Sequence, residues 1–214
     1  MDFAKRLENL TAQQRQQLLA QLRQMVGKSA AQPEPIAVVG IGCRFPGGAN
    51  TPDAYWQMLR RGGDGMAEVP RERWDIDTHF DPNPDAPGKV YTRWFGMLKE
   101  RIDEFDAEFF DIPGREARGM DPQQRLLMEV AWEALENAAI SPERLFGTDT
   151  GVFMGLSTIE FHPQQFAPGR EAELDVYSNT GVNFSVAAGR LSYFLGMHGP
   201  AMAVDTACSS SLTA

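Results

Sequence analysis

The sequence has few of the residues that build disulfide-stapled or metal-binding proteins. Among 214 residues there are two cysteines, Cys43 and Cys208, and three histidines. Two cysteines make no disulfide framework. There is also no signal-peptide pattern and no long apolar run. We therefore expect a cytoplasmic protein that has no membrane span, binds no metal and holds no cofactor directly.

Positive charge is also in short supply. The formal net charge is −9, which argues against general nucleic-acid binding. The charge is uneven, because residues 1–28 hold five basic and two acidic side chains, a net +3 that leaves −12 for the remainder. A hydrophobic content of 43% and a charged content of 23% are ordinary for a soluble globular protein. The length suffices for one substantial domain, with or without an appendage.

An amphipathic helix is predicted near the N-terminus. Thr11 and Gln14 form a capping-box pattern, and the helix that follows over residues 12–26 is expected to end at Gly27. Its apolar stripe consists of Leu18, Leu19, Leu22, Met25 and Val26. Such a stripe demands a partner without naming it, so the helix either lies on its own domain or docks onto another chain. Residues 28–35 read as a linker.

Residues 36–41 are predicted to form a buried strand. The glycines of Gly40-Ile41-Gly42 suggest a dinucleotide-binding loop, but Phe45 stands where the third glycine of that fingerprint is needed. We therefore expect these glycines to shape a turn. A helix should then begin with Thr51 as its N-cap and end at Gly62-Gly63. We expect that helix to bury three residues: Tyr55, Trp56 and Leu59.

Strands and helices alternate through the rest of the chain, after a loop-rich stretch over residues 64–113. Asp121 and Pro122 should open a long helix whose apolar stripe covers a sheet, while Glu129, Glu133 and Glu136 face away. Further elements are predicted at residues 150–156 (strand), 181–195 (helix) and 201–204 (strand). This alternation indicates a layered α/β domain with parallel strand pairing.

The last fourteen residues read as a strand that turns sharply into a helix, with Cys208 near the turn. Unpaired N–H groups at a helix start favour thiolate over thiol, and they could hold an oxyanion when the thiolate attacks a carbonyl. The small residues Ala207, Ser209 and Ser210 leave room for a substrate. The alternative is that Cys208 is a small buried hydrophobe.

The residues around Cys208 decide between these alternatives. Residues 205–212, Asp-Thr-Ala-Cys-Ser-Ser-Ser-Leu, resemble the active-site motif of β-ketoacyl synthases, specifically the ketosynthase domains of modular type I polyketide synthases. Further family-like segments occur in family order at residues 35–47, 85–93, 120–125 and 185–193. The sequence departs from the family where a Ser-Pro pair is usual, at Asp111-Ile112-Pro113-Gly114, and at Val182-Asn183.

The resemblance implies a fold and a domain organisation. The family has a thiolase-like αβαβα fold built from two similar halves, and it is typically dimeric. Residues 35–214 should form the first half and stop just after the nucleophile. Residues 1–34 are similar to the N-terminal helical linkers of such synthases, so we expect this segment to dock onto an upstream synthase chain.

The resemblance also implies a reaction. Cys208 would hold the growing acyl chain as a thioester and pass it to a malonyl-type extender in a decarboxylative condensation, supported by Asp205, Thr206, Ala207 and Ser209. Both substrates would be carried on the phosphopantetheine of an acyl carrier protein. Sulfur suits the first step because it is a strong nucleophile.

The histidines of this sequence, His79, His162 and His198, are expected to be structural or on the surface. In the family the catalytic histidines follow the cysteine at a distance that exceeds this sequence. We therefore expect the 214 residues alone to be inactive in condensation. Two alternatives remain: a truncated, non-catalytic product that acts only through association, and thiolase-like acyl transfer without decarboxylation.

Overall fold

The computed structural model describes residues 11–29 and 35–214, and in the helix of the first range it describes side chains up to residue 21. The chain divides into two compact units, one up to Val38 and one from Val39 onward, which are considered separately. No helix among the described residues has the length and apolar character needed to cross a membrane.

The first unit holds helix α2, Ala12–Ser29. The predicted capping box is confirmed, because the Thr11 hydroxyl accepts from Gln14 N at 3.3 Å and Gln14 Oε1 accepts from Thr11 N at 3.0 Å. The predicted end at Gly27 is wrong, since the helix continues to Ser29. Leu18 is half-buried and Leu19 exposed. The side chains of Leu22, Met25 and Val26, the rest of the predicted stripe, lie outside the described side chains.

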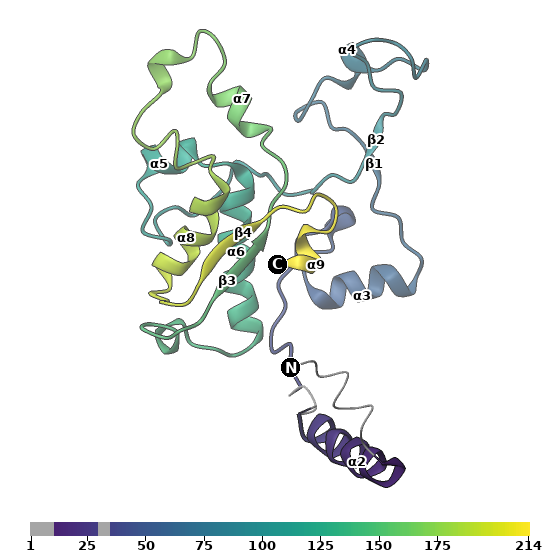
Figure 1. Cartoon of the computed structure of the whole chain (residues 1–214). Coiled ribbons are helices and arrows are strands. Elements are labelled where there is room, and N and C mark those ends of the chain that lie inside the picture. The colour runs from purple at the N-terminus through teal and green to yellow at the C-terminus, as the bar shows by residue number, and fades with distance from the viewer. Residues whose placement is uncertain (1–10, 30–34) are drawn as a thin grey trace. The chain divides into compact units, whose positions relative to one another are not determined.

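The second unit is centred on two parallel strands. Strand β3, Val152–Gly155, pairs with β4, Ala201–Val204, with Val152 opposite Ala201 and Gly155 opposite Val204. This confirms the strand predicted at residues 201–204, a shorter form of the strand predicted at residues 150–156, and their parallel pairing. Figure 1 shows helix α8, Phe184–Phe194, on one side of the pair, and the short helix α9, Ser210–Thr213, on the other. The layered arrangement therefore places the end of β4 between two helices.

The main core lies between the strands and α8. Its buried members are Val152, Met154, Leu156, Ala187, Ala188, Leu191, Leu195 and Met197. Ala188 is completely buried, so a small side chain allows α8 to pack closely against the strands. The intervening strand residues point the other way, and Phe153 is 49% exposed. This alternation follows from the two-residue period of a strand.

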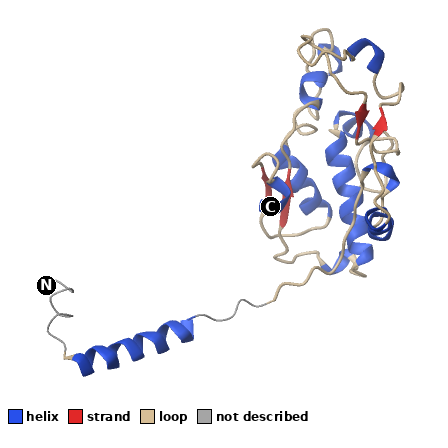
Figure 2. Cartoon of the chain, turned by 90° about the vertical axis from the view of Figure 1, so that its right-hand side faces the viewer, coloured by secondary structure: helices blue, strands red, loops and turns tan. Residues whose placement is uncertain are grey.

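A second core cluster lies between helix α6, Pro122–Asn137, and the loops that precede it. It consists of Phe110, Ile112, Met120 and Met128, with Trp132 and Phe194 packed against it. The Phe105 and Phe110 rings stack at 5.2 Å, and Phe110 lies 5.1 Å from Phe194 of α8. Much of this unit is loop, as Figure 2 shows, and these aromatic contacts anchor part of it.

Helix α6 follows the predicted start, because the Asp121 carboxylate caps it by accepting from Gln123 N at 2.8 Å. The predicted division of its faces is partly wrong. The buried residues of the helix are Gln124, Arg125 and Met128. Glu129 lies partly buried, and burial raises the pKa of its carboxyl. The predicted acidic face is therefore not uniformly exposed: Glu129 and Glu133 are partly buried, and Glu136 is exposed.

The strand predicted over residues 36–41 is absent, and these residues have no regular secondary structure. Within the second unit, the backbone at Gly40 and Gly42 runs against α6 instead of beside a strand. A Cβ on Gly40 would lie 2.2 Å from Ala134 O, and one on Gly42 would lie 2.3 Å from Val130 O. Ile41 N donates to Asn137 Oδ1 at 3.0 Å. The two glycines therefore permit close approach to a helix, and neither has the positive φ of a special turn.

Helix α3, Pro52–Arg60, begins as predicted, with the Thr51 hydroxyl accepting from Ala54 N at 3.1 Å. The predicted burial of its apolar residues is wrong. Trp56 is 58% exposed and Leu59 is 51% exposed, while Tyr55 is half-buried beside the Phe45 ring at 4.4 Å. The apolar pattern predicted the helix correctly, but it did not predict that two of the apolar side chains are exposed.

The remaining elements are short. They are helices α4 (Ile76–His79), α5 (Gly114–Gly119) and α7 (Phe161–Gln165), the 3-10 turns η1 (Pro46–Gly48), η2 (Pro142–Arg144) and η3 (Glu171–Glu173), and the antiparallel strands β1 (Ala67–Glu68) and β2 (Trp94–Phe95).

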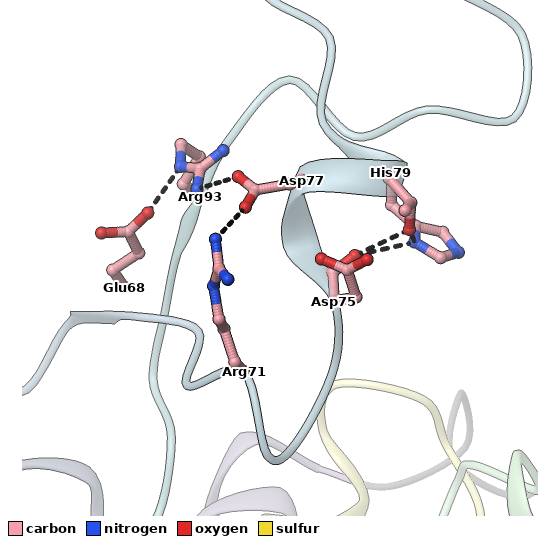
Figure 3. A network of polar contacts seen from close by, with 7 residues as sticks. Glu68, Arg71, Asp75, Asp77, His79 and Arg93 are labelled. Carbon is pink, nitrogen blue, oxygen red and sulfur yellow. Dashed lines mark hydrogen bonds and ion pairs between the residues drawn. The ribbon is translucent and has the colours of Figure 1, made fainter.

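Arg93 ties the β1–β2 pair to α4, as Figure 3 shows. Its Nε donates to Glu68 Oε1 at 2.6 Å and its Nη2 donates to Asp77 Oδ1 at 2.7 Å. The guanidinium also lies 5.2 Å from the centre of the Phe80 ring. Arg71 binds the second oxygen of Asp77 at 2.7 Å. Arg93 thus joins a carboxylate of β1 to a carboxylate of α4 and to the Phe80 ring that follows α4.

We expect Arg93→Gln to loosen residues 67–95, because the neutral amide cannot hold both carboxylates. Backbone amides there should exchange with deuterium faster than in the wild type. Arg101→Gln is the control, since Arg101 pairs only with its sequence neighbours Asp103 and Glu104 among the described residues. Equal exchange in Arg93→Gln and wild type would show that the network does not hold this region.

The same network predicts a pH dependence. The hydrogen bond from Arg93 lowers the pKa of Asp77 below its ordinary value of 3.8. The stabilising contribution is therefore complete above that ordinary value and is lost as pH falls through the lowered pKa. Wild-type exchange at residues 67–95, corrected for the intrinsic pH effect, should rise in that acidic range.

Candidate active site

The candidate nucleophile lies on the turn between β4 and α9. Strand β4 ends at Val204, whose carbonyl accepts from Leu156 N at 3.2 Å. The first helical residue of α9 is Ser210, and Ser209 is its N-cap. Cys208 is exposed and directly precedes that cap. The strand-turn-helix setting expected from the sequence is therefore present.

Ala207, immediately before Cys208, has a left-handed backbone with φ of 54°. This conformation is uncommon for a residue with a Cβ, and it persists only where the surroundings enforce it. Two hydrogen bonds contribute here, because Ala207 N donates to Asp205 Oδ1 at 2.9 Å and Ala207 O accepts from Ser210 N at 3.1 Å. The turn thus aims Cys208 away from the line of the strand.

Ser210 holds this turn from the inside. The residue is only 5% exposed, and its hydroxyl donates to Ala207 O at 2.7 Å. The same hydroxyl accepts from Thr206 N at 3.0 Å. Ser210 therefore satisfies a donor and an acceptor of the two residues that precede Cys208. It was not among the predicted supporting residues, because three consecutive serines give no sequence signal for which one points inward.

The predicted supporting residues lie in the turn, but they bind one another and not the sulfur. Thr206 Oγ1 lies 2.9 Å from Ser209 Oγ and 3.2 Å from Thr213 Oγ1. Ser209 Oγ also donates to Thr206 O at 2.9 Å. Asp205 and Ala207 are joined as described above. The geometry brings all four residues to the turn, and their part in catalysis remains a prediction.

Gly155, at the end of β3, lets α9 lie directly against the strand. A Cβ at this position would lie 2.6 Å from Ser211 N and 2.7 Å from Ser210 C. Distances below 3.0 Å to backbone atoms cannot be relieved by a side-chain movement. No sequence motif singles out Gly155, and its place at the carboxyl end of a predicted strand was the available signal.

The two thiols of the chain lie in opposite environments. Cys43 is buried and its Sγ lies 3.7 Å from Ala49 O. Burial raises the pKa of this thiol, which makes it a poor nucleophile. Cys208 is exposed on a turn among small side chains. An electrophile from solvent therefore has access to Cys208 and not to Cys43.

None of the three histidines contacts Cys208 in the described ranges. His79 is held by Thr78 Oγ1 at 2.7 Å beside the Trp74 ring, and His162 stacks on Phe166 at 4.6 Å. His198 is exposed and its backbone N donates to Thr148 O at 2.8 Å. The described residues also include no group of three or more His, Cys, Asp or Glu side chains suited to a metal ion. Among the described residues, the Cys208 thiol therefore has no adjacent histidine that could act as its base.

Comparison with known proteins agrees with this geometry. The family model described as "Beta-ketoacyl synthase, N-terminal domain" matches residues 33–214. One component of the phenolphthiocerol/phthiocerol polyketide synthase of Mycobacterium tuberculosis is 53% identical over 181 residues, covering 85% of this chain and 10% of that protein. Another component of the same synthase is 48% identical over 209 residues, covering 98% and 13%. The chain thus spans roughly a tenth of the length of these relatives.

Solved structures with a similar fold are ketosynthase domains. The oxazolomycin ketosynthase domain of Streptomyces albus has a TM-score of 0.75 at 37% identity, covering 85% of this chain and 31% of that one. The ketosynthase of module 6 of the bacillaene synthase of Bacillus subtilis has a TM-score of 0.66 at 35% identity, covering 83% and 27%. These likenesses confirm the thiolase-like fold predicted from the sequence, with its N-terminal half present.

Ser210→Ala should disturb the turn, because Thr206 N loses its acceptor and Ala207 O keeps only the bond from Ser210 N. We expect Cys208 to react with iodoacetamide several-fold more slowly than in the wild type and with an altered pH profile, whereas Ser210→Thr keeps a hydroxyl and should recover most of the rate. Ser211→Ala is the control, since Ser211 is exposed. Identical rates and profiles in Ser210→Ala and Ser211→Ala would mean that Ser210 does not position the turn.

Proposed function

Because the chain belongs to the β-ketoacyl synthase family, we propose that it provides the acyl-accepting nucleophile, Cys208, of a polyketide ketosynthase that extends an acyl chain. The single observation that carries this proposal is the exposed thiol on the left-handed turn between β4 and α9. The polyketide synthase relatives and the ketosynthase neighbours support it. Acyl transfer to sulfur is the chemistry that such a thiol can perform.

In the proposed first step, the Cys208 thiolate attacks the carbonyl of an acyl thioester carried on the phosphopantetheine of an acyl carrier protein. A new bond forms between Sγ and the acyl carbon. The bond between that carbon and the carrier sulfur breaks, and the carrier thiolate leaves and takes up a proton. The turn built by Thr206, Ala207 and Ser210 keeps Sγ in one place during this exchange, which reduces the entropy lost on reaching the transition state.

In the proposed second step, a malonyl-type extender on the carrier protein loses carbon dioxide, and the resulting carbanion attacks the acyl group on Cys208. The new carbon–carbon bond forms as the bond to Sγ breaks, which returns the thiolate. Developing negative charge on the oxygens needs nearby donors. Because His79, His162 and His198 make no contact with Cys208, we assign acylation and not condensation to these 214 residues on their own.

We also propose the partners expected from the sequence. The acyl carrier protein delivers both substrates, and the complete ketosynthase acts as a homodimer in the cytoplasm. The basic segment that contains α2 would dock onto an acidic segment of an upstream synthase chain, because residues 1–28 carry a net +3 while the rest of the chain is acidic. An amphipathic helix in a groove is a common way to join two chains.

Acyl loading tests the nucleophile. When the chain is incubated with a short acyl thioester, intact mass should show one acyl adduct. Cys208→Ala should remove the adduct because it removes the accessible thiol. Cys43→Ala is the matched control and should load like the wild type, since Cys43 is buried. Loading that survives in Cys208→Ala, or disappears in Cys43→Ala, would contradict the assignment.

Removal of residues 1–30 tests the docking role of the first helix. In the synthase that contains this chain, the deletion should lower acyl transfer from the preceding chain at least about tenfold, as expected for the loss of one docking contact. The rate of Cys208 loading by a free acyl thioester should not change, which separates docking from catalysis. Unchanged transfer between chains would show that the helix is not a docking element.

A further inference from the structure

A cavity apart from Cys208 carries an unusual concentration of arginine. It has a volume of about 650 Å³ and lies among residues of α5, α6, α7 and the segment around η3. Four arginines line it: Arg115, Arg118, Arg125 and Arg170. None of its lining residues belongs to the turn that holds Cys208. We propose that this arginine cavity binds a phosphate group, a site that the proposed acyl transfer does not use.

The carboxylates in the cavity do not neutralise all four arginines. Arg115 Nε pairs with Asp175 at 2.7 Å. Arg170 Nε donates to Glu173 at 3.0 Å. The third carboxylate of the lining, Asp103, forms its ion pair with Arg101, which lies outside the cavity lining. These are the carboxylates that line the cavity, so Arg118 and Arg125 have no ion-pair partner within the described residues.

Arg125 makes this lack of a partner significant. Arg125 is only 9% exposed, and its Nε and Nη2 both donate to the carbonyl of Met120, at 3.1 Å and 2.6 Å. Burial lowers the pKa of Arg125, so the loss of water outweighs the attraction of the nearby Asp121 and Asp103 carboxylates, neither of which forms an ion pair with it. An anion in the cavity would add the negative charge that these carboxylates do not supply in full. Arg118, on α5, lies on the exposed side of the same cavity.

The chemistry of the lining favours phosphate. Guanidinium groups present parallel N–H donors that match the oxygens of a phosphate. Gln165 also lines the cavity, and its Oε1 is buried without a donor among the described residues, while its Nε2 donates to Gly119 O at 3.3 Å. A protonated phosphate oxygen can donate to Gln165 Oε1 and at the same time leave other oxygens for the arginines. The volume leaves room for phosphate alone or for phosphate as part of a larger molecule.

Titration calorimetry with inorganic phosphate, at constant ionic strength set with chloride, tests the site. We expect saturable binding to the whole chain at one site, with a dissociation constant of roughly 1 mM or tighter. Arg118→Gln, an exposed change that should not affect folding, is expected to weaken binding about tenfold because it removes a charge-assisted hydrogen bond. Arg60→Gln, on the exposed surface of α3, should bind like the wild type.

Methyl phosphate distinguishes the two sources of the phosphate group. Equal affinity for methyl phosphate and inorganic phosphate would support a site for a phosphate ester, whereas much weaker binding of the ester would support a site for the free ion. The absence of saturable binding would overturn the proposal. So would equal binding by Arg118→Gln and the wild type. Loss of self-association in Arg118→Gln without any phosphate binding would also overturn it and would assign the arginines to a contact between two copies.

Discussion

The left-handed backbone at Ala207 is the constraint on which the position of Cys208, the proposed nucleophile, depends. A strand that continued straight beyond Val204 would carry Cys208 along the sheet, whereas the turn sends the chain back toward α9. The strained residue is retained because the Asp205 carboxylate accepts from its N–H and the Ser210 hydroxyl donates to its carbonyl. The exposure of the thiol is therefore a product of local polar contacts, while the apolar core only fixes where the turn begins.

The main core lies apart from the Cys208 turn. Val152 and Met154 on one face of β3 pack against α8, and α8 is fixed in turn by a partly buried ion pair between Arg190 and Glu116 of α5. Gln124 of α6 accepts from Arg190 Nε at 3.3 Å and donates to Thr180 O at 3.3 Å. These contacts join the helices behind the strands into one support. The opposite face of the strand pair carries α9 and the turn that holds Cys208.

The parts of this structure that local rules decide could be predicted from the sequence. The N-caps at Thr11, Thr51 and Asp121 follow from the affinity of a side-chain oxygen for free helix N–H groups, and all three are present. The segment Ala201–Val204 is predictable as a strand because an apolar run before a small-residue turn has few other outcomes. The turn around Cys208 was found through its motif, and its exposure agrees with a reactive thiol.

Features that depend on distant neighbours could not be predicted. The apolar residues at 36–41 carry a strand pattern, but the backbone at Gly40 lies against α6, and nothing local reveals that. Trp56 and Leu59 lie on the apolar face of a correctly predicted helix. The pattern could not show that no other segment covers them. Ser210 is the buried one of the three serines because it lies against β3 at Gly155. In each case the missing information is which segment lies opposite.

Gly155 shows that the position of Cys208 depends on a residue far from it in the sequence. Because α9 rests on the bare backbone of β3 at this residue, changes on the exposed side of α9 are easier to accommodate than a single added methyl group at Gly155. A mutation there would leave every residue of the Cys208 motif intact and still displace the helix that follows it. A search for inactive relatives that examined only the Cys208 motif would therefore wrongly classify such a sequence as active.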